Sequence, residues 1–368
     1  MTVLRSPLRS PLRSPLYSPL VGKYGNAALA LLRGKQGFAV SFIDDAVAVQ
    51  DNATPSNNFV GSMAQAVDRG ILVNASPPTK WLLNSSGILT SGSNLRCQYS
   101  AAGVPLGFLP EPQRTNLLLN SAVLATQSVT VSATAYTLSF EGTGTVTLSG
   151  ASTAGPLVGT GATDRVPLTF TPSAGSLTLT VSGTVNYANL EAGLFPTSPI
   201  VTAGSQVTRA ADNLYVDLTK IPALGSEFTV IGEAEPCPDT SNTAFNIFSA
   251  FGSAAEYFVL RNGTAGSRQL QLVNRNGGAN TGVVSVGSAV AASRFKYAAA
   301  CKTNDFELVT DGVSLGTDTS GTMLSGATNL YIGTTGSGGF GGHWAAPVGF
   351  LALIPERLSQ ADMIARTS

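Results

Sequence analysis

The chain has little charge, a single histidine and few aromatic residues. Charged residues make up 11% of its 368 residues and the net charge is zero, whereas an average globular protein is about 25% charged. A neutral, charge-poor chain offers no general attraction for nucleic acid or acidic membranes. It also lacks the run of about 18 apolar residues that a membrane span needs. We therefore expect no nucleic-acid partner and no membrane insertion.

Cysteine is equally scarce. Cys97, Cys237 and Cys301 are odd in number, widely spaced and outside any CxxC motif, so they indicate neither a disulfide framework nor a zinc site. We expect buried free thiols, since unpaired cysteine behaves as a small hydrophobic residue. The one histidine, His343, excludes most Ser-His-Asp and Cys-His schemes unless it is the base, and we interpret it as a hydrogen-bonded loop residue.

Two groups of side chains with oxygen atoms are candidates for catalysis or metal binding. Glu233 and Glu235 are two apart on a predicted strand and so share a face, as the paired carboxylates of some glycosidases do. The chain continues into Pro236, however, without a further acid, so we expect both to be solvent-facing strand residues. Oxygen ligands for calcium are scattered without a spacing that brings them together, and turn formation explains them better: Asp239, Asn304, Asp305, Asp311 and Asp318. The sequence thus predicts no catalytic residue, no metal site, no cofactor and no enzyme activity.

What the chain has in abundance is glycine and β-branched residues. Its 40 glycines and its many valines and threonines favour strands joined by tight turns. Apolar residues recur at every second position from Tyr136 to Phe140 and from Leu177 to Val181, which is typical of half-buried sandwich strands. Further strands are predicted after Leu214, with a hairpin turn at Asp311-Gly312. We predict an all-β fold with an extended N-terminal arm, a small proximal region and two antiparallel β-sandwich (jelly-roll) domains.

The amino-terminal region is unusual. Residues 4–20 read LRSPLRSPLRSPLYSPL, and proline at every fourth position excludes helix and leaves an extended polyproline-like arm. A disordered basic tail and a docking arm are both compatible with this repeat; the regularly spaced leucines favour docking. The anchoring candidates are Leu4, Arg5, Leu8, Arg9, Leu12, Arg13, Leu16, Tyr17 and Leu20. A short helix capped by Asn26 and ended by Gly34 is predicted next.

Two segments frame the middle of the chain: GVPLGFLPEPQRTNLLLNS (103–121) and NLEAGLFPTSPIVTAGSQVTRAAD (189–212). Their order and motifs resemble those of bacteriophage tail-fibre and head-fibre proteins, with a carbohydrate-binding-module-like jelly roll between them. The last 150 residues resemble the laminin-G/concanavalin-A-like fold, on the strand carrying Asp311-Gly312, the following NLYIG and the final LALIPERLSQADM. The resemblance implies these units: an anchoring arm and short helix (1–36), a hairpin-rich proximal region (37–113), a jelly roll (114–205), a linker (206–213) and a concanavalin-A/laminin-G-like sandwich (214–368).

The resemblance also implies a function. We expect a virion fibre or spike, assembled in the host cytoplasm, that binds other virion proteins (capsid, tail or baseplate) through residues 1–36 and displays its sandwiches for contact with a host-surface glycan. Phe340, His343 and Trp344 are the predicted glycan contacts. The alternatives left open are a purely structural decoration protein and a polysaccharide-depolymerising tailspike. Fibres of this kind are usually homo-oligomers, often trimers.

Overall fold

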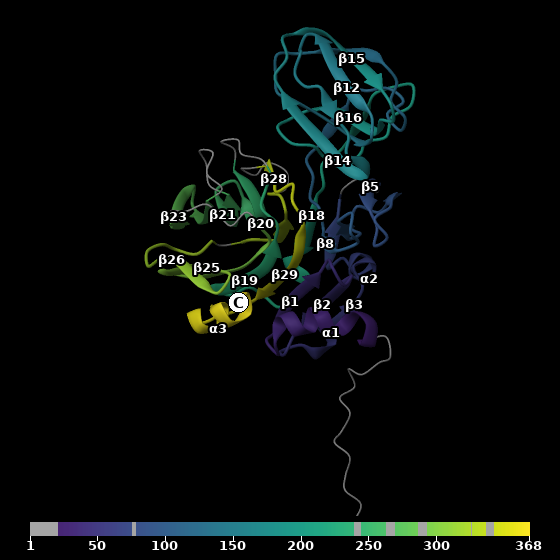
Figure 1. The fold of residues 1–368 in the computed structure, drawn as a ribbon. Helices are drawn as coiled ribbons and strands as arrows, with labels where there is room; N and C mark the ends of the chain where they lie inside the picture. The colour runs from purple at the N-terminus through teal and green to yellow at the C-terminus, as the bar shows by residue number, and fades with distance from the viewer. Residues whose placement is uncertain are drawn as a thin grey trace, which may run out of the picture.

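The structure is a computed structural model that describes residues 21–368 except 76–78, 239–243, 263–268, 286–292, 325 and 336–341. Figure 1 shows two bodies, one above the other. We call the lower one the base and the upper one the jelly roll. Strands dominate both, which confirms the predicted all-β fold. Within the described residues, no helix has the length and apolarity to cross a membrane. The predicted anchoring arm lies outside the described residues.

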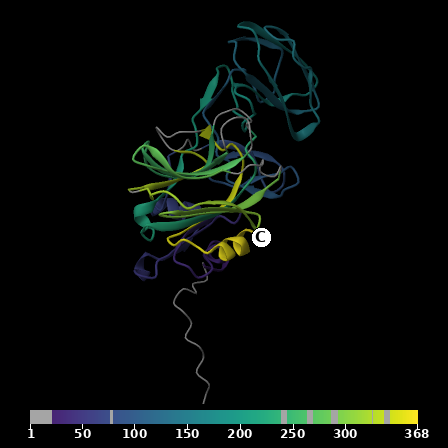
Figure 2. The ribbon, with the colours of Figure 1, turned by 90° about the vertical axis from the view of Figure 1, so that its left-hand side faces the viewer.

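Two large sheets form the base, stacked face to face as Figure 2 shows. The first, the helix-side sheet, runs in the order β26 (Val313–Asp318), β25 (Asp305–Thr310), β24 (Phe295–Lys302), β19 (Glu227–Ala234), β29 (Val348–Ile354), β1 (Gly37–Ser41), β2 (Ala46–Gln50) and β3 (Phe59–Gly61). The second runs β23 (Ala279–Ser285), β22 (Leu270–Asn276), β21 (Glu256–Asn262), β20 (Phe245–Ser253), β27 (Asn329–Ile332), β18 (Leu214–Asp217) and β4 (Leu72–Asn74), with β28 (Gly342–His343) beside β20.

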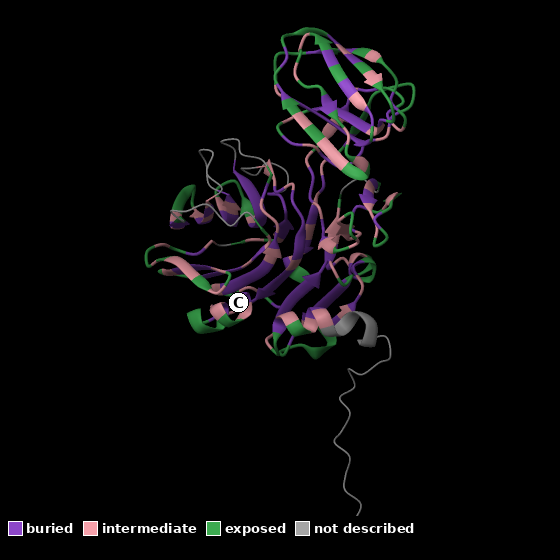
Figure 3. Cartoon of the chain, in the orientation of Figure 1, coloured by how far each residue is buried: buried purple, intermediate pink, exposed green. Residues whose placement is uncertain are grey.

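Alternation along the strands divides the base into two cores. On β24, Tyr297 and Cys301 point into the main core between the sheets, whereas Ala298 and Ala300 point the other way. Small alanines on that outer face let helices approach closely, and α1 (Val21–Leu32) and α3 (Gln360–Thr367) pack there. Purple residues in Figure 3 trace these buried layers through the base. The two ends of the described chain therefore cover the same face.

Helix boundaries agree in part with the sequence. Gly34 follows α1 with φ of +78°, as expected for a helix-ending glycine, but the helix begins at Val21, so Asn26 lies inside it and is not its cap. Ser359 caps α3 by accepting a hydrogen bond from the Asp362 amide. The remaining short helices are α2 (Met63–Asp68), η1 (Pro55–Asn57) and η2 (Leu218–Lys220).

The expected proximal region is not a separate unit. Strand β1 pairs with β29, more than 300 positions later, and β4 pairs with β18. Residues 37–75 thus extend both sheets of the C-terminal sandwich, which corrects the boundary expected at 213/214. The physical reason is that β1 is buried along its whole length and needs a partner that lies far away in sequence. Two hairpins, β5 (Lys80–Leu83) with β6 (Leu89–Gly92) and β7 (Gln98–Tyr99) with β8 (Pro105–Gly107), follow on the side of the base.

The jelly roll is inserted into the base between β8 and β18. One of its sheets has the order β10 (Gln127–Val131), β15 (Gly175–Ser182), β12 (Thr145–Gly150) and β13 (Leu157–Val158), and the other has β14 (Gly161–Phe170), β11 (Tyr136–Gly142) and β16 (Asn186–Ala192). Its core is a cluster of its own, built from the alternating residues that the sequence singled out, such as Leu138, Phe140, Leu177 and Leu179. The predicted period of two is confirmed here.

Candidate functional site

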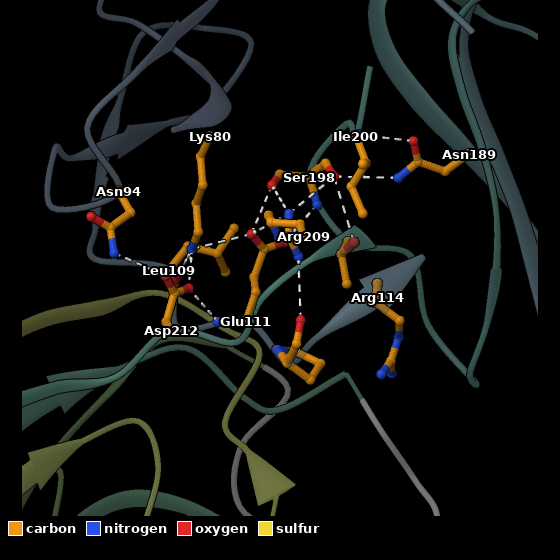
Figure 4. A network of polar contacts seen from close by, with 12 residues as sticks. Lys80, Asn94, Leu109, Glu111, Arg114, Asn189, Ser198, Ile200, Arg209 and Asp212 are labelled. Atoms are coloured by element: carbon orange, nitrogen blue, oxygen red, sulfur yellow. Dashed lines mark hydrogen bonds and ion pairs between the residues drawn. The ribbon is translucent and has the colours of Figure 1, made fainter. Parts of the chain in front are cut away.

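The two framing segments meet where the jelly roll joins the base. Strand β9 (Arg114–Asn116) pairs antiparallel with β17 (Val207–Arg209), so the outgoing and returning chains lie side by side. We call this junction, residues 108–116 and 196–212 with Lys80 and Asn94, the neck (Figure 4). The linker expected at 206–213 therefore contains a paired strand, β17, and the buried side chains of Arg209 and Asp212. The physical reason is charge, because the side chains of Arg209 and Asp212 are both buried here and each needs a partner of opposite charge.

Four charged side chains form the centre of the neck. Lys80 Nζ lies 3.2 Å from Glu111 Oε2 and also binds the Asp212 carboxylate, while Arg209 Nη1 lies 3.1 Å from Glu111 Oε2. All four side chains are at most 6% exposed. Two cations and two anions balance, which is what makes their burial tolerable. Burial alone would raise the pKa of Glu111, but the charges of Arg209 and Lys80 and the hydrogen bonds from Ser198 lower it to about 2.

Neutral donors complete the network on both sides. The Ser198 amide and hydroxyl donate to the Glu111 carboxylate at 2.5 and 2.7 Å. On the base side, the Asn94 side chain and the Glu111 amide donate to Asp212 at 3.0 and 2.7 Å. Lys80 additionally donates to the Leu109 carbonyl at 2.5 Å. Each of the two carboxylates thus accepts hydrogen bonds from several donors in addition to its ion pairs.

A second polar cluster fastens the exit segment to the jelly roll. The Thr197 amide and hydroxyl both donate to Glu191 at 2.7 Å. The Asn116 amide group donates to the carbonyls of Ala188 and Ile200 at 2.8 Å. The buried residues come from both framing segments, so the motifs that carried the sequence resemblance are those that build the joint. Lys80 and Asn94 were not singled out from the sequence.

Of the predicted glycan contacts, Trp344 is buried and His343 is half-buried. Trp344 is 2% exposed and its indole Nε1–H donates to the Glu235 carbonyl at 2.7 Å, so it belongs to the main core. His343 is half-buried and its Nε2 is 2.8 Å from the Asp212 carbonyl oxygen; burial lowers its pKa. Strand β28 pairs with β20 through Gly342 and His343, and Trp344 directly follows this pairing. Phe340 lies outside the described residues.

The acidic pair of Glu233, on β19, and Glu235, just beyond the end of this strand, is also held in place. Arg294 bridges Glu233 and Glu235, with Nη1 2.5 Å from the first and Nη2 3.3 Å from the second. The Glu233 side chain is only 16% exposed, so the expectation of a solvent-facing residue is wrong for Glu233. The shared cation is the reason, because it draws both carboxylates against the sheet. Neither is positioned as an unpaired acid or base.

The calcium-ligand candidates serve local structure where they are described. Asp311 lies in the predicted hairpin turn with φ of +45° and accepts from the Lys296 amide. Asp318 accepts from the amides of Val283 and Ser320, and Asp305 pairs with Arg357. Across the described ranges, no group of three or more His, Cys, Asp or Glu side chains could hold a metal ion. Asp239 lies outside these ranges.

Cavities flank the hairpins on the side of the base. One of about 360 Å³ is mainly apolar and lies between α2 and the hairpins, lined among others by Phe42, Met63, Leu95 and Cys97. Another of about 190 Å³ lies at the neck, between the β5–β6 hairpin and the three-stranded sheet of the jelly roll. The second is lined by polar side chains from both bodies and is the better candidate for a ligand.

No family model and no curated protein matches the sequence. Among solved structures, the chain is distantly similar to the CBM40 of the Ruminococcus gnavus IT-sialidase (15% identity, 39% of this chain and 83% of that one, TM-score 0.33). It is also similar to an SAP-like pentraxin from Limulus polyphemus (15%, 39% and 70%, TM-score 0.30) and to domain 4 of an extracellular arabinanase from Geobacillus stearothermophilus (9%, 45% and 77%, TM-score 0.35). These are distant likenesses to β-sandwich domains. The resemblance to phage fibres stays a prediction.

Proposed function

We propose that the chain is a non-enzymatic structural protein of a phage virion, a fibre or spike, held to the particle by its amino-terminal arm and displaying its jelly roll toward host-surface glycans. The observation that carries the proposal is the position of helix α1 relative to the jelly roll. Helix α1, which directly follows the proline-spaced repeat, lies on the face of the base farthest from the jelly roll in both views (Figures 1 and 2). Helix α1 and the jelly roll therefore lie at opposite ends of the described part of the chain.

The neck supports this arrangement. A displayed domain that must transmit contact to a particle needs a stiff connection, and the junction is a strand pair reinforced by a buried, charge-balanced network. Breaking one member of such a network is strongly destabilising, so the joint is held in one geometry. A flexible linker would leave the two bodies free to move.

Particle incorporation tests the anchoring claim. Deleting residues 1–20 should leave a folded protein, because the base cores begin at Ala28, while assembled particles should lack it. The matched control replaces Pro7, Pro11, Pro15 and Pro19 with alanine, which keeps the length and the leucines but removes the extended constraint. Normal incorporation of the truncated protein would contradict the proposal.

The two alternatives make different predictions. A purely structural decoration protein would join particles in the same way but bind no glycan, so loss of the jelly roll would leave adsorption to host cells unchanged. A depolymerising tailspike would release reducing sugar from host polysaccharide. The pairing of both Glu233 and Glu235 with Arg294 argues against an unpaired acid–base couple there, and Glu233→Gln would abolish release only if that couple were catalytic.

Homo-oligomerisation remains part of the proposal. The jelly roll exposes apolar side chains that a symmetric partner can cover: Val123 is 72% exposed, Val158 is 55% and Leu194 is 43%. Light scattering on the purified chain would measure the stoichiometry, with a trimer as one expected outcome and a monomer at all concentrations as the contradicting one.

A further inference from the structure

The neck cavity of about 190 Å³ is built by both bodies of the molecule. The jelly roll contributes Glu141 from β11 and Thr163 and Arg165 from β14, and the base contributes Trp81 from β5. The exit segment, with Phe195, closes one side. Pockets for drug-sized ligands usually measure about 300–1,000 Å³, so this one suits a smaller group.

Glu141 is the most informative residue in the cavity. It is 4% exposed, and no hydrogen bond reaches its carboxyl group within the described part of the chain. Burial raises the pKa of this carboxyl group, and the nearby charge of Arg165 offsets only part of that effect. Thr137, four residues earlier on β11, is by contrast hydrogen-bonded to the Thr169 hydroxyl and donates to the Gly193 carbonyl. Burying an unpaired carboxyl group is costly. A partner that enters the cavity would remove that cost.

Arg165 presents the complementary donors. Its Nη1 donates to the Tyr187 carbonyl at 2.7 Å, which fixes the guanidinium. Its Nε and Nη2 are buried and have no hydrogen-bond acceptor among the described residues. Tyr187 itself has φ of +48°, a conformation that is strained for an aromatic residue and that tends to occur at functional sites. Its ring packs on Trp81, with centroids 5.4 Å apart.

These groups select the chemistry of the ligand. A cation would need several converging oxygens, and Glu141 supplies the one unpaired carboxylate in this cavity. An anion would be drawn to Arg165 but repelled by Glu141. Vicinal hydroxyl groups satisfy both, since each hydroxyl can donate to a carboxylate and accept from a guanidinium. Half-buried Trp81 and buried Phe195 add apolar surface for the carbon face of a sugar ring.

We propose that this neck cavity binds one uncharged pyranose residue of a glycan, with vicinal hydroxyls bridging Glu141 and Arg165 and the ring against Trp81. The inference rests on the proposed glycan-binding function and gives it a location. It places recognition at the junction of the two bodies, so the rigid neck serves to hold the two walls of the pocket together.

Saturation-transfer NMR and calorimetry on the full-length protein test the inference. The probes are the methyl glycosides of glucose, galactose and mannose, N-acetylglucosamine, and glucuronic acid as the charged counterpart. We expect at least one neutral pyranoside to bind at concentrations up to about 10 mM. Glu141→Gln and Arg165→Gln should each weaken binding at least about tenfold. The matched control, Glu227→Gln on β19, removes an exposed pairing with Lys302 far from the cavity and should bind as the unaltered protein does.

A second variant guards against misfolding. Thr163 is exposed on the edge strand β14 and lines the cavity, so Thr163→Trp should block it while thermal unfolding stays unchanged. Three outcomes would overturn the inference: no neutral pyranoside binds, all variants bind equally, or glucuronic acid binds best and gains affinity in Glu141→Gln. Equal binding by all variants would leave the proposed function intact with its glycan site elsewhere. Failed incorporation of the arm deletion into particles concerns anchoring and is independent of the cavity.

Discussion

Removing the charge of Glu111 should lower the free energy of unfolding of the protein by weakening the junction between its two bodies. Glu111→Gln keeps the shape of the side chain but leaves Lys80 and Arg209 without their shared counter-ion. Breaking a buried pair in this way costs about 3–5 kcal/mol. The pKa gives a second route to the magnitude: a fall from 4.5 to about 2 corresponds to about 3 kcal/mol of stability. The two figures agree, and we expect a loss of about 3 kcal/mol at pH 7.

The pH dependence makes the test specific. Because the pKa of Glu111 is lowered on folding, its contribution is complete above pH 4.5 and is lost as the pH falls toward 2. The difference between Glu111→Gln and the unaltered protein should therefore shrink over that interval. Urea unfolding followed by tryptophan fluorescence at several pH values measures it. Glu227→Gln, whose pairing with Lys302 is half-exposed, should cost under about 1 kcal/mol. A difference for Glu111→Gln that is equally small, or that does not depend on pH, would refute the reasoning.

Three further predictions follow from the fold. Replacing residues 117–206 with an Asn-Gly turn should leave a folded base, because β9 and β17 are already paired and the cores share no residue; a molten product by near-ultraviolet circular dichroism would contradict this. Trp344→Phe should destabilise the protein by about 1–3 kcal/mol through the lost bond to a buried carbonyl, with glycan binding unchanged. Burial raises the pKa of Cys301, so its thiol should resist alkylation at pH 8 until the protein unfolds; rapid modification of the native protein would show that the site is open.

Local patterns predicted the local parts of the fold. The alternation from Tyr136 to Phe140 located a jelly-roll strand because a period of two directly reflects which side chains face the core. The turn at Asp311-Gly312 followed from the positive φ values that its two residues adopt. The pairing of β1 with β29 could not be predicted from the sequence, since no local pattern specifies a partner strand more than 300 residues away.

The candidate site was predicted less well, for a related reason. The framing segments were recognised, but residues 206–213 were interpreted as a linker, although Arg209 and Asp212 require buried partners. Glu141 and Arg165 look like ordinary polar strand residues until the insertion of the jelly roll places them against Trp81. Trp344 was predicted to contact a glycan but is buried. A glycine-rich neighbourhood indicates a loop, but it does not determine whether a side chain in that loop is exposed.

An electron cryo-microscopy map of the intact phage particle would show directly how the protein is attached and oriented. We expect the α1 face of the base to lie against the particle, density for the arm to continue into a virion protein, and the jelly roll to point outward with the neck cavity accessible. A map in which the jelly roll contacts the particle and the α1 face is free, or in which the protein is absent, would contradict it.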